Sequence, residues 1–154
     1  MADAVEKLAA IADACDVCTF KVPLAYVKNK TLYNLNSSNR MVYRQRMDIK
    51  NRYKKIIEPI IEKLSRFDSG HQHMIIQLVW ADRRSRDLDN IVAGTLKWLQ
   101  DSIVELGKLD DDKHISFTFL PAIHEPKNKE HYCHVTMIDL CSNNYFKKIK
   151  EKNE

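Results

Sequence analysis

The sequence predicts an α+β domain in which a small mixed β-sheet packs against two main helices. Two long segments, 39–66 and 88–106, carry apolar residues at three- and four-residue steps, which is the spacing of a helix with one buried face. Three shorter segments, 74–81, 114–123 and 131–140, are apolar throughout or alternate apolar and polar residues, as strands do. Because helices and strands alternate along most of the chain, we expect one sheet with helices packed against it.

The length and composition predict a single domain. The 154 residues suit one core, and only three glycines and four prolines leave little room for linkers. We expect one domain over 1–154, with an extra N-terminal helix within 1–15 and a basic tail over 142–154. No apolar run approaches the roughly 20 residues that a membrane helix needs, and the acidic start is unlike a secretory signal. We therefore expect an intracellular, cytoplasmic protein with no membrane partner.

The first part of the chain predicts a short helix, an edge strand and a loop. Residues 3–14 carry apolar side chains on one helical stripe. Residues 18–24 alternate apolar and polar side chains, and Pro23 would keep this strand at a sheet edge or end its pairing. The polar, Asn-rich segment 28–39 has the composition of a loop.

The two long helices and the central strand follow. In the helix over 39–66, Pro59 should introduce a kink or a division. The strand at 74–81 is largely apolar on both faces, which is typical of the middle of a covered sheet. After the helix over 88–106, Gly107 is a suitable C-terminal stop.

The four cysteines leave a zinc site as a weak alternative. Cys15 and Cys18 form a C-x-x-C pair, a spacing found in half of a zinc site or in a redox pair. Cys133 and Cys141 lie eight positions apart on a predicted strand, about 26 Å at strand rise, so they do not supply a second close pair. We expect reduced thiols, and a zinc-stabilised interaction protein is the less favoured interpretation.

The residues that could take part in catalysis or binding concentrate between Asp82 and Ile115. The central strand leads into three arginines, two acids and an asparagine at the next helix start, and three acids precede the following strand: Arg83, Arg84, Arg86, Asp87, Asp89, Asn90, Asp110, Asp111 and Asp112. If that strand pairs beside the central one, we expect both sets of carboxylates to meet at one edge of the sheet. Carboxylates so close repel unless a cation lies between them, and hard oxygen ligands favour Mg²⁺ or Mn²⁺. Arginines beside such a metal suit a phosphodiester backbone.

Each piece also has a simpler interpretation. Asp87 or Asp89 alone is a favoured helix cap, and an acid run such as 110–112 is typical of a solvated turn. The arginines alone describe an exposed basic patch. Their joint occurrence around one strand–helix–strand unit favours a common site.

The segments RRSRDLDNIVAGTLKWLQDSI and LDDDKHI closely resemble the RusA-like Holliday junction resolvases, a family of small metal-dependent endodeoxyribonucleases. The shared signature is a strand leading into basic residues and D-x-D-N, then a helix, then D-D-x-x-hydrophobic opening another strand. The similar layout extends loosely from about Lys21 to Leu140. The resemblance implies a Mg²⁺-dependent endonuclease, with Mn²⁺ a possible substitute, that cuts four-way or other branched DNA in recombination and repair. It also implies a homodimer with one active site per subunit.

By position, the resemblance makes Asp87 and Asp89 the first pair of catalytic metal ligands. When Ile115 anchors the D-D-x-x-I pattern, Asp112 is the final acid and Asp111 is its neighbour. An alignment anchored on the leucine before the acid run would shift that pair by one residue, to 110–111. We prefer the first alignment because Ile115 begins a clearly alternating strand.

The DNA-facing residues follow from the same resemblance, with one departure. Arg83, Arg84, Arg86 and Asn90 are expected to position the DNA backbone. The family usually has a lysine four residues after the second aspartate of D-x-D, whereas this chain has an alanine there.

Lys97 is the candidate for the role of the absent lysine. The family position is Ala93, and Lys97 lies one turn further along the helix, about 12 Å of helix rise from Asp89. Its long side chain leans toward the helix N-terminus, so it could substitute in part, or it is an ordinary exposed lysine. The departure makes a catalytically weak or inactive branched-DNA-binding protein of the same fold the second hypothesis.

Overall fold

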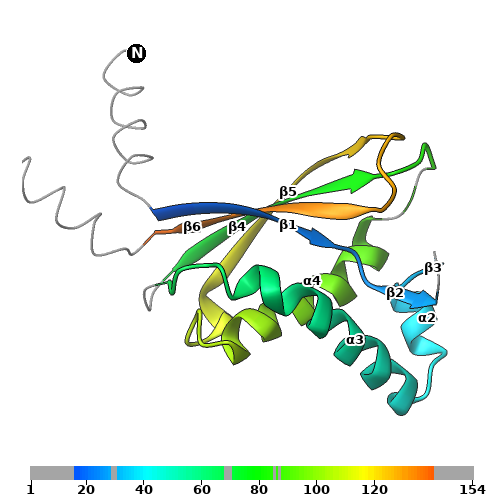
Figure 1. Ribbon diagram of the computed structural model, residues 1–154, viewed down its shortest axis with the longest axis horizontal. Helices are drawn as coiled ribbons and strands as arrows, with labels where there is room; N and C mark the ends of the chain where they lie inside the picture. The colour runs from blue at the N-terminus through cyan, green and yellow to red at the C-terminus, as the bar shows by residue number, and fades with distance from the viewer. Residues whose placement is uncertain (1–15, 29–30, 68–70, 85, 87, 141–154) are drawn as a thin grey trace, which may run out of the picture.

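The computed structural model describes residues 16–28, 31–67, 71–84, 86 and 88–140 (Figure 1). In chain order these form β1 (Asp16–Pro23), β2 (Tyr26–Lys28), β3 (Thr31–Leu32), α2 (Leu35–Asn39), α3 (Tyr43–Ile61), β4 (Gln72–Trp80), α4 (Leu88–Glu105), the short 3₁₀ helix η1 (Asp112–His114), β5 (Ile115–His124) and β6 (Tyr132–Asp139). The helix expected over 3–14 and the basic tail over 142–154 lie outside the described residues.

The four long strands form one mixed sheet in the order β1-β6-β4-β5. β6 is antiparallel to both β1 and β4, whereas β5 is parallel to β4. Helix α4 therefore makes the crossover that a parallel pair of strands requires. The prediction of an α+β fold with a mixed sheet and two main helices is confirmed. Strand β1 lies at an edge of the sheet, as Pro23 indicated.

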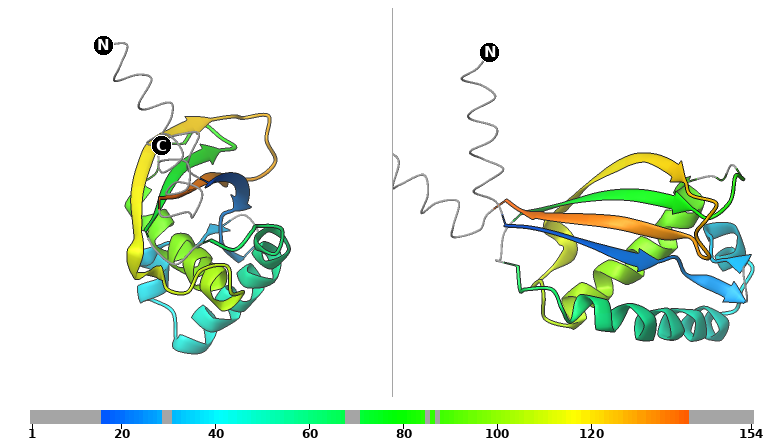
Figure 2. Two further views of the ribbon diagram at one scale, coloured as in Figure 1. Left: turned by 90° about the vertical axis from the view of Figure 1, so that its left-hand side faces the viewer. Right: turned by 45° about the horizontal axis from the view of Figure 1, so that its top comes forward.

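Helices α3 and α4 lie on one face of this sheet (Figure 2). Met74, Ile76 and Leu78 of β4 are buried on the helix-facing side, whereas Ile75 and Gln77 are only partly buried on the other side. The expected central position of β4 is confirmed. Among the described residues of β4, full burial on its second face is limited to Val79, near the end of the strand. The largely apolar sequence of β4 reflects its position inside the sheet more than burial on both faces.

Helix α3 is shorter at both ends than the helix expected over 39–66. The separate helix α2 precedes it, because the Asn34 side chain accepts a hydrogen bond from the Ser37 backbone N–H and starts a helix there. The segment 28–39, expected as a loop, thus contains strand β3 and helix α2. Pro59 lies in the last turn of α3, which ends two residues later at Ile61.

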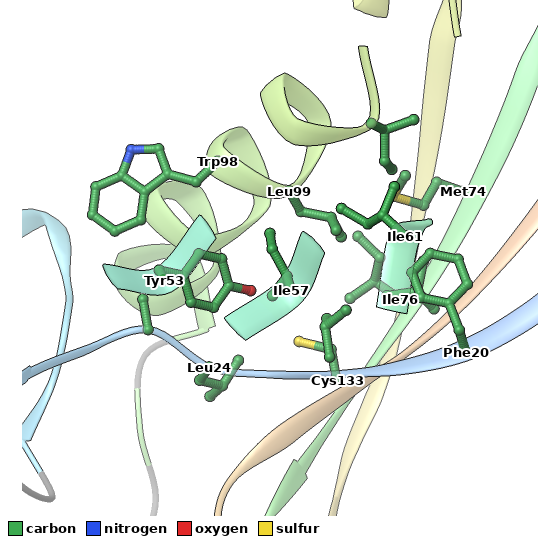
Figure 3. Close-up of a cluster of buried hydrophobic side chains, with 14 of the residues drawn as sticks. Phe20, Leu24, Tyr53, Ile57, Ile61, Met74, Ile76, Trp98, Leu99 and Cys133 are labelled. Carbon is green, nitrogen blue, oxygen red and sulfur yellow. The ribbon is translucent and has the colours of Figure 1, made fainter. Parts of the chain in front are cut away.

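The core joins the two long helices to the sheet (Figure 3). The Tyr53 hydroxyl of α3 donates a hydrogen bond to the Pro23 carbonyl at 2.9 Å and fixes α3 to the end of β1. The Trp98 ring of α4 lies 4.4 Å from the Tyr33 ring, centre to centre. Tyr33 also lies against Gly94, where a Cβ would come within 2.4 Å of its ring, so α4 needs a glycine at this contact.

The end of α4 follows the prediction. Gly107 adopts φ +66°, a left-handed conformation that glycine takes without strain. The Gly107 N–H bonds the Val104 carbonyl, and the Lys108 N–H bonds the Ile103 carbonyl. This cap turns the chain from α4 toward the acid run and β5.

Candidate functional site

The parallel pairing of β4 and β5 separates the two acidic segments. In register, Gln72 at the start of β4 pairs with Ile115, and Trp80 at its end pairs with His124. The acids at 110–112 therefore lie near the start of β4, whereas the segment from Asp82 onward follows its end. The nine residues of β4 span about 26 Å. The expectation that both sets of carboxylates meet at one edge of the sheet is wrong, because a parallel crossover returns the chain to the edge where the first strand began.

Helix α4 and the acid run nevertheless come together around Lys97. The Lys97 Nζ lies 2.6 Å from Asp112 Oδ2 and 3.1 Å from Asp101 Oδ1. On the other side of Asp101, the Lys50 Nζ of α3 lies 2.8 Å from Oδ2. Two lysines and two aspartates thus alternate across three elements. Asp101 was not identified from the sequence.

These side chains border a solvent-open pocket of about 260 Å³, which we call the acidic pocket. Its lining comes from the second half of α4 and from the acid run: Lys97, Asp101, Val104, Glu105, Asp110, Asp111 and Asp112. Five of these seven residues are acids, so the pocket favours cations. The Lys97 ammonium is the cation within this lining.

The charges in the acidic pocket stabilise one another. The hydrogen bonds that Lys97 donates to Asp112, and then to Asp101, raise the pKa of Lys97 above its ordinary value. Burial opposes ionisation of Asp101, but the hydrogen bonds from Lys50 and Lys97 outweigh it, and the pKa of Asp101 lies below its ordinary value. Both groups are therefore ionised at neutral pH.

The three acids at 110–112 have different surroundings. Only Asp112 bonds Lys97 among the described contacts of the run. The Asp111 side chain accepts a hydrogen bond from the Lys113 backbone N–H and caps η1. Asp110 is exposed and forms an ion pair with Arg66. Asp112 is thus the acid of this run that contacts a side chain of α4, and its assignment as the final acid stays a prediction.

The D-x-D-N segment lies at the other end of α4. Asp89 and Asn90 belong to the first turn of the helix, whereas Asp87 and all three side chains lie outside what the structure describes. Along the helix axis, Asp89 is about 12 Å from Lys97 and about 18 Å from Asp101. The assignment of Asp87 and Asp89 as metal ligands stays a prediction.

A second cluster lies where β4 ends, and the sequence did not single out its central residue. The Asp82 carboxylate receives both terminal nitrogens of Arg86, each at 2.6 Å, and the Arg84 backbone N–H at 3.0 Å. The Arg86 guanidinium lies over the Trp80 ring, 5.0 Å from its centre. We call Asp82, Arg86 and Trp80 the Asp82 clamp. The available signal was an acid followed four residues later by an arginine, directly after a buried strand.

The surrounding strands hold the clamp in place. The Ala81 N–H donates a hydrogen bond to His131 Nδ1 at 2.9 Å, so the neutral ring of His131 carries its proton on Nε2. That nitrogen lies 3.9 Å from Asp82 Oδ2. From β5, a ring nitrogen of His124 lies 2.8 Å from the Asp82 carbonyl oxygen.

The clamp also fixes the ionisation of its members. Hydrogen bonds from Arg86 hold the pKa of Asp82 well below its usual range. Burial, reinforced by the Arg86 charge, lowers the pKa of His131. Asp82 is thus a carboxylate and His131 a neutral imidazole at pH 7.

The three predicted DNA-contacting arginines therefore differ. The Arg86 side chain is only 16% exposed and is held by Asp82. Arg83 and Arg84 are exposed beside it. Among these three arginines, only Arg83 and Arg84 therefore expose their charge to solvent.

The cysteines offer no zinc centre among the described residues. Cys133 is buried, and burial raises the pKa of its thiol to about 12. Cys18 is partly buried on β1, while Cys15 and Cys141 lie outside the described residues. In the described ranges, no three His, Cys, Asp or Glu side chains are grouped so as to hold a metal ion.

Comparison with known proteins adds no identification. No protein-family model matches the chain, and no curated protein matches it. Among the described helices, none has the length and apolar character needed to cross a membrane.

Proposed function

We propose that this protein is a Mg²⁺-dependent endonuclease that cuts branched DNA and resembles the RusA-like resolvases in fold and in homodimeric assembly. The observation that supports this most is the contact of Lys97 with Asp112. The resemblance assigns a lysine and a final acid to one active site, and here they meet although 15 positions separate them. The shift of the lysine by one helical turn thus leaves it beside the acid.

The acidic pocket suits Mg²⁺ in its donor chemistry. Asp101 and Asp112 flank one ammonium group, so their carboxylates lie on either side of a single cationic position. Mg²⁺ is commonly bound by one or two carboxylates, with waters and substrate phosphates completing its shell. When bound, Mg²⁺ would activate water and offset the charge that develops on the phosphate. Asp111 would assist. Asp89 lies about 12 Å of helix rise from Lys97, too far to share this ion, so the proposed ligands are those of the acidic pocket.

The chain's own residues supply the remaining functions. Lys97 steadies a phosphate or water beside Asp112, and Lys50 keeps Asp101 ionised behind it. Arg83 and Arg84 contact the DNA backbone at the other end of α4. Helix α4 has 18 residues and spans about 27 Å, so DNA that contacts both ends would extend over roughly eight base steps.

A homodimer suits the symmetric cleavage of a four-way junction. A four-way junction has two opposed strands to cut, and a twofold axis places two identical sites symmetrically. We therefore propose one acidic pocket per subunit and recognition of junction shape through phosphates more than through base sequence.

Cleavage of synthetic four-way junctions in Mg²⁺ tests the proposal. Wild-type protein is expected to nick the junction, and Asp112→Asn is expected to lose most of that activity. Asp48→Asn is the control, because Asp48 is an exposed acid of α3 outside the lining of the acidic pocket. Absence of cleavage by wild-type protein, or full cleavage by Asp112→Asn, would reject the endonuclease.

A second candidate is a branched-DNA-binding protein that no longer cuts. Ala93 at the family lysine position and the occupation of the space between Asp101 and Asp112 by Lys97 favour it. Junction binding in Ca²⁺ without nicking in either Mg²⁺ or Mn²⁺ would select this candidate over the enzyme.

A further inference from the structure

The Asp82 clamp lies beside the exposed arginines of the proposed DNA-binding surface but has no assigned role. Its carboxylate neutralises the arginine nearest the core. The histidine contacts come from His124 in β5 and from His131, which directly precedes β6. The Trp80 carbonyl also accepts the Glu125 N–H at 2.8 Å, which ties the end of β4 to the end of β5. The start of the connection between β4 and α4 is therefore held by hydrogen bonds with three residues: His131, His124 and Glu125.

The ion pair between Asp82 and Arg86 is more strongly oriented than an ordinary surface ion pair. Both terminal nitrogens of Arg86 bond Asp82, and the guanidinium also covers an indole ring. A planar, bidentate and stacked guanidinium is strongly oriented and gives up this geometry at a cost. Arg86 is thus poorly placed to turn toward a DNA phosphate.

The geometry points to Asp82 as a positioning residue, which holds Arg86 against Trp80 and thereby presents Arg83 and Arg84 to the DNA backbone. This inference rests on the proposed function, because it assigns the phosphate contacts of that function to two arginines and removes the third. The Asp82 carboxylate accepts the Arg86 hydrogen bonds that a DNA phosphate would otherwise accept. Loss of Asp82 should then have two opposite effects: an additional free cation for DNA, and a poorly oriented connection for cleavage.

Salt dependence of junction binding separates the roles of the arginines. Each phosphate contact contributes about 0.9 to the slope of log affinity against log salt. Arg84→Gln should therefore reduce the slope by about 0.9. The double variant Asp82→Asn, Arg86→Gln removes one charge of each sign and should leave the slope unchanged. Asp82→Asn alone frees Arg86 and should increase the slope by about 0.9.

Kinetics and amide exchange test the positioning role itself. Asp82→Asn should lower kcat for junction cleavage at least tenfold, because the connection that carries Arg83 and Arg84 is no longer oriented. KM should not rise, because these two arginines keep their phosphate contacts and the freed Arg86 adds one. In the free protein, the Ala81 and Arg84 amides should exchange with solvent roughly tenfold faster in this variant. Lys63→Gln, an exposed lysine just beyond α3, is the control for loss of a remote charge.

The results divide clearly. A double variant whose slope falls by about 0.9 would make Arg86 a phosphate ligand and overturn the inference. Asp82→Asn with wild-type kcat and wild-type amide exchange would also overturn it. Failure of the proposed function has a different signature, namely wild-type protein that neither binds nor cuts branched DNA.

Discussion

Replacement of Lys97 by glutamine tests the acidic pocket most directly. The substitution keeps a side chain of similar length but removes the ammonium that bridges Asp101 and Asp112. Two opposite consequences follow. Cleavage should fall, because the phosphate or water loses its positive neighbour, whereas the pocket becomes more negative and should bind a divalent cation more tightly.

The magnitudes follow from the exposure of the site. The Lys97 side chain is 59% exposed, so its ion pairs are screened and should contribute at most about 1 kcal/mol to the free energy of unfolding. Loss of one group that stabilises developing charge typically costs 10²- to 10³-fold in kcat, roughly 3–4 kcal/mol. Removal of a unit charge about 4 Å from a divalent cation in a water-like medium changes the metal binding free energy by about 2 kcal/mol, or roughly thirtyfold in affinity.

The assays are cleavage of a four-way junction, Mn²⁺ titration followed by electron paramagnetic resonance, and thermal unfolding. Lys63→Gln is the control, because Lys63 is an exposed lysine outside the lining of the pocket. It should change all three measurements little. Undiminished cleavage by Lys97→Gln, or Mn²⁺ affinity equal to or weaker than that of wild type, would refute the role assigned to the ammonium.

Three further substitutions test the fold that positions the pocket and the clamp. Gly94→Ala should destabilise the protein by about 1–3 kcal/mol in urea unfolding, because its Cβ would overlap the ring of Tyr33. Tyr53→Phe should cost about 1 kcal/mol, because it leaves the Pro23 carbonyl without this donor. Asp82 has a lowered pKa, so its stabilising contribution is complete above its unfolded pKa of about 3.9 and is lost as pH falls further. Asp82→Asn should therefore show less acid-dependent loss of stability below about pH 4 than wild type, and an equal loss in both would contradict the pairing.

The long periodic elements were predictable because burial on one face determines them. Ile49, Tyr53, Ile57 and Ile61 lie at four-residue steps and are all buried on α3. The short elements within 28–39 were missed because local hydrogen bonds decide them. A side-chain cap from Asn34 starts α2 in a segment whose composition otherwise describes a loop.

The candidate site was predictable in its residues more than in its arrangement. The acid run and Lys97 were identified, but their contact depends on how the turn after Gly107 directs the chain back along α4. The meeting of two acidic segments at one sheet edge was wrong because it overlooked the direction of the parallel crossover. Asp82 was missed because a single acid among arginines carries no periodic signal, and its partners His124 and His131 are more than 40 positions away in the sequence.

Because β4 and β5 are parallel, helix α4 sets the distance between the exposed arginines and the acidic pocket. Its length, set by the start at Leu88 and the glycine stop after Glu105, fixes how far apart the two charged ends lie. Removal of one helical turn would shorten that separation by about 5.4 Å, which corresponds to between one and two nucleotides of a DNA strand. In a nuclease built this way, the place of the cut relative to the junction is encoded in the number of turns of a single helix.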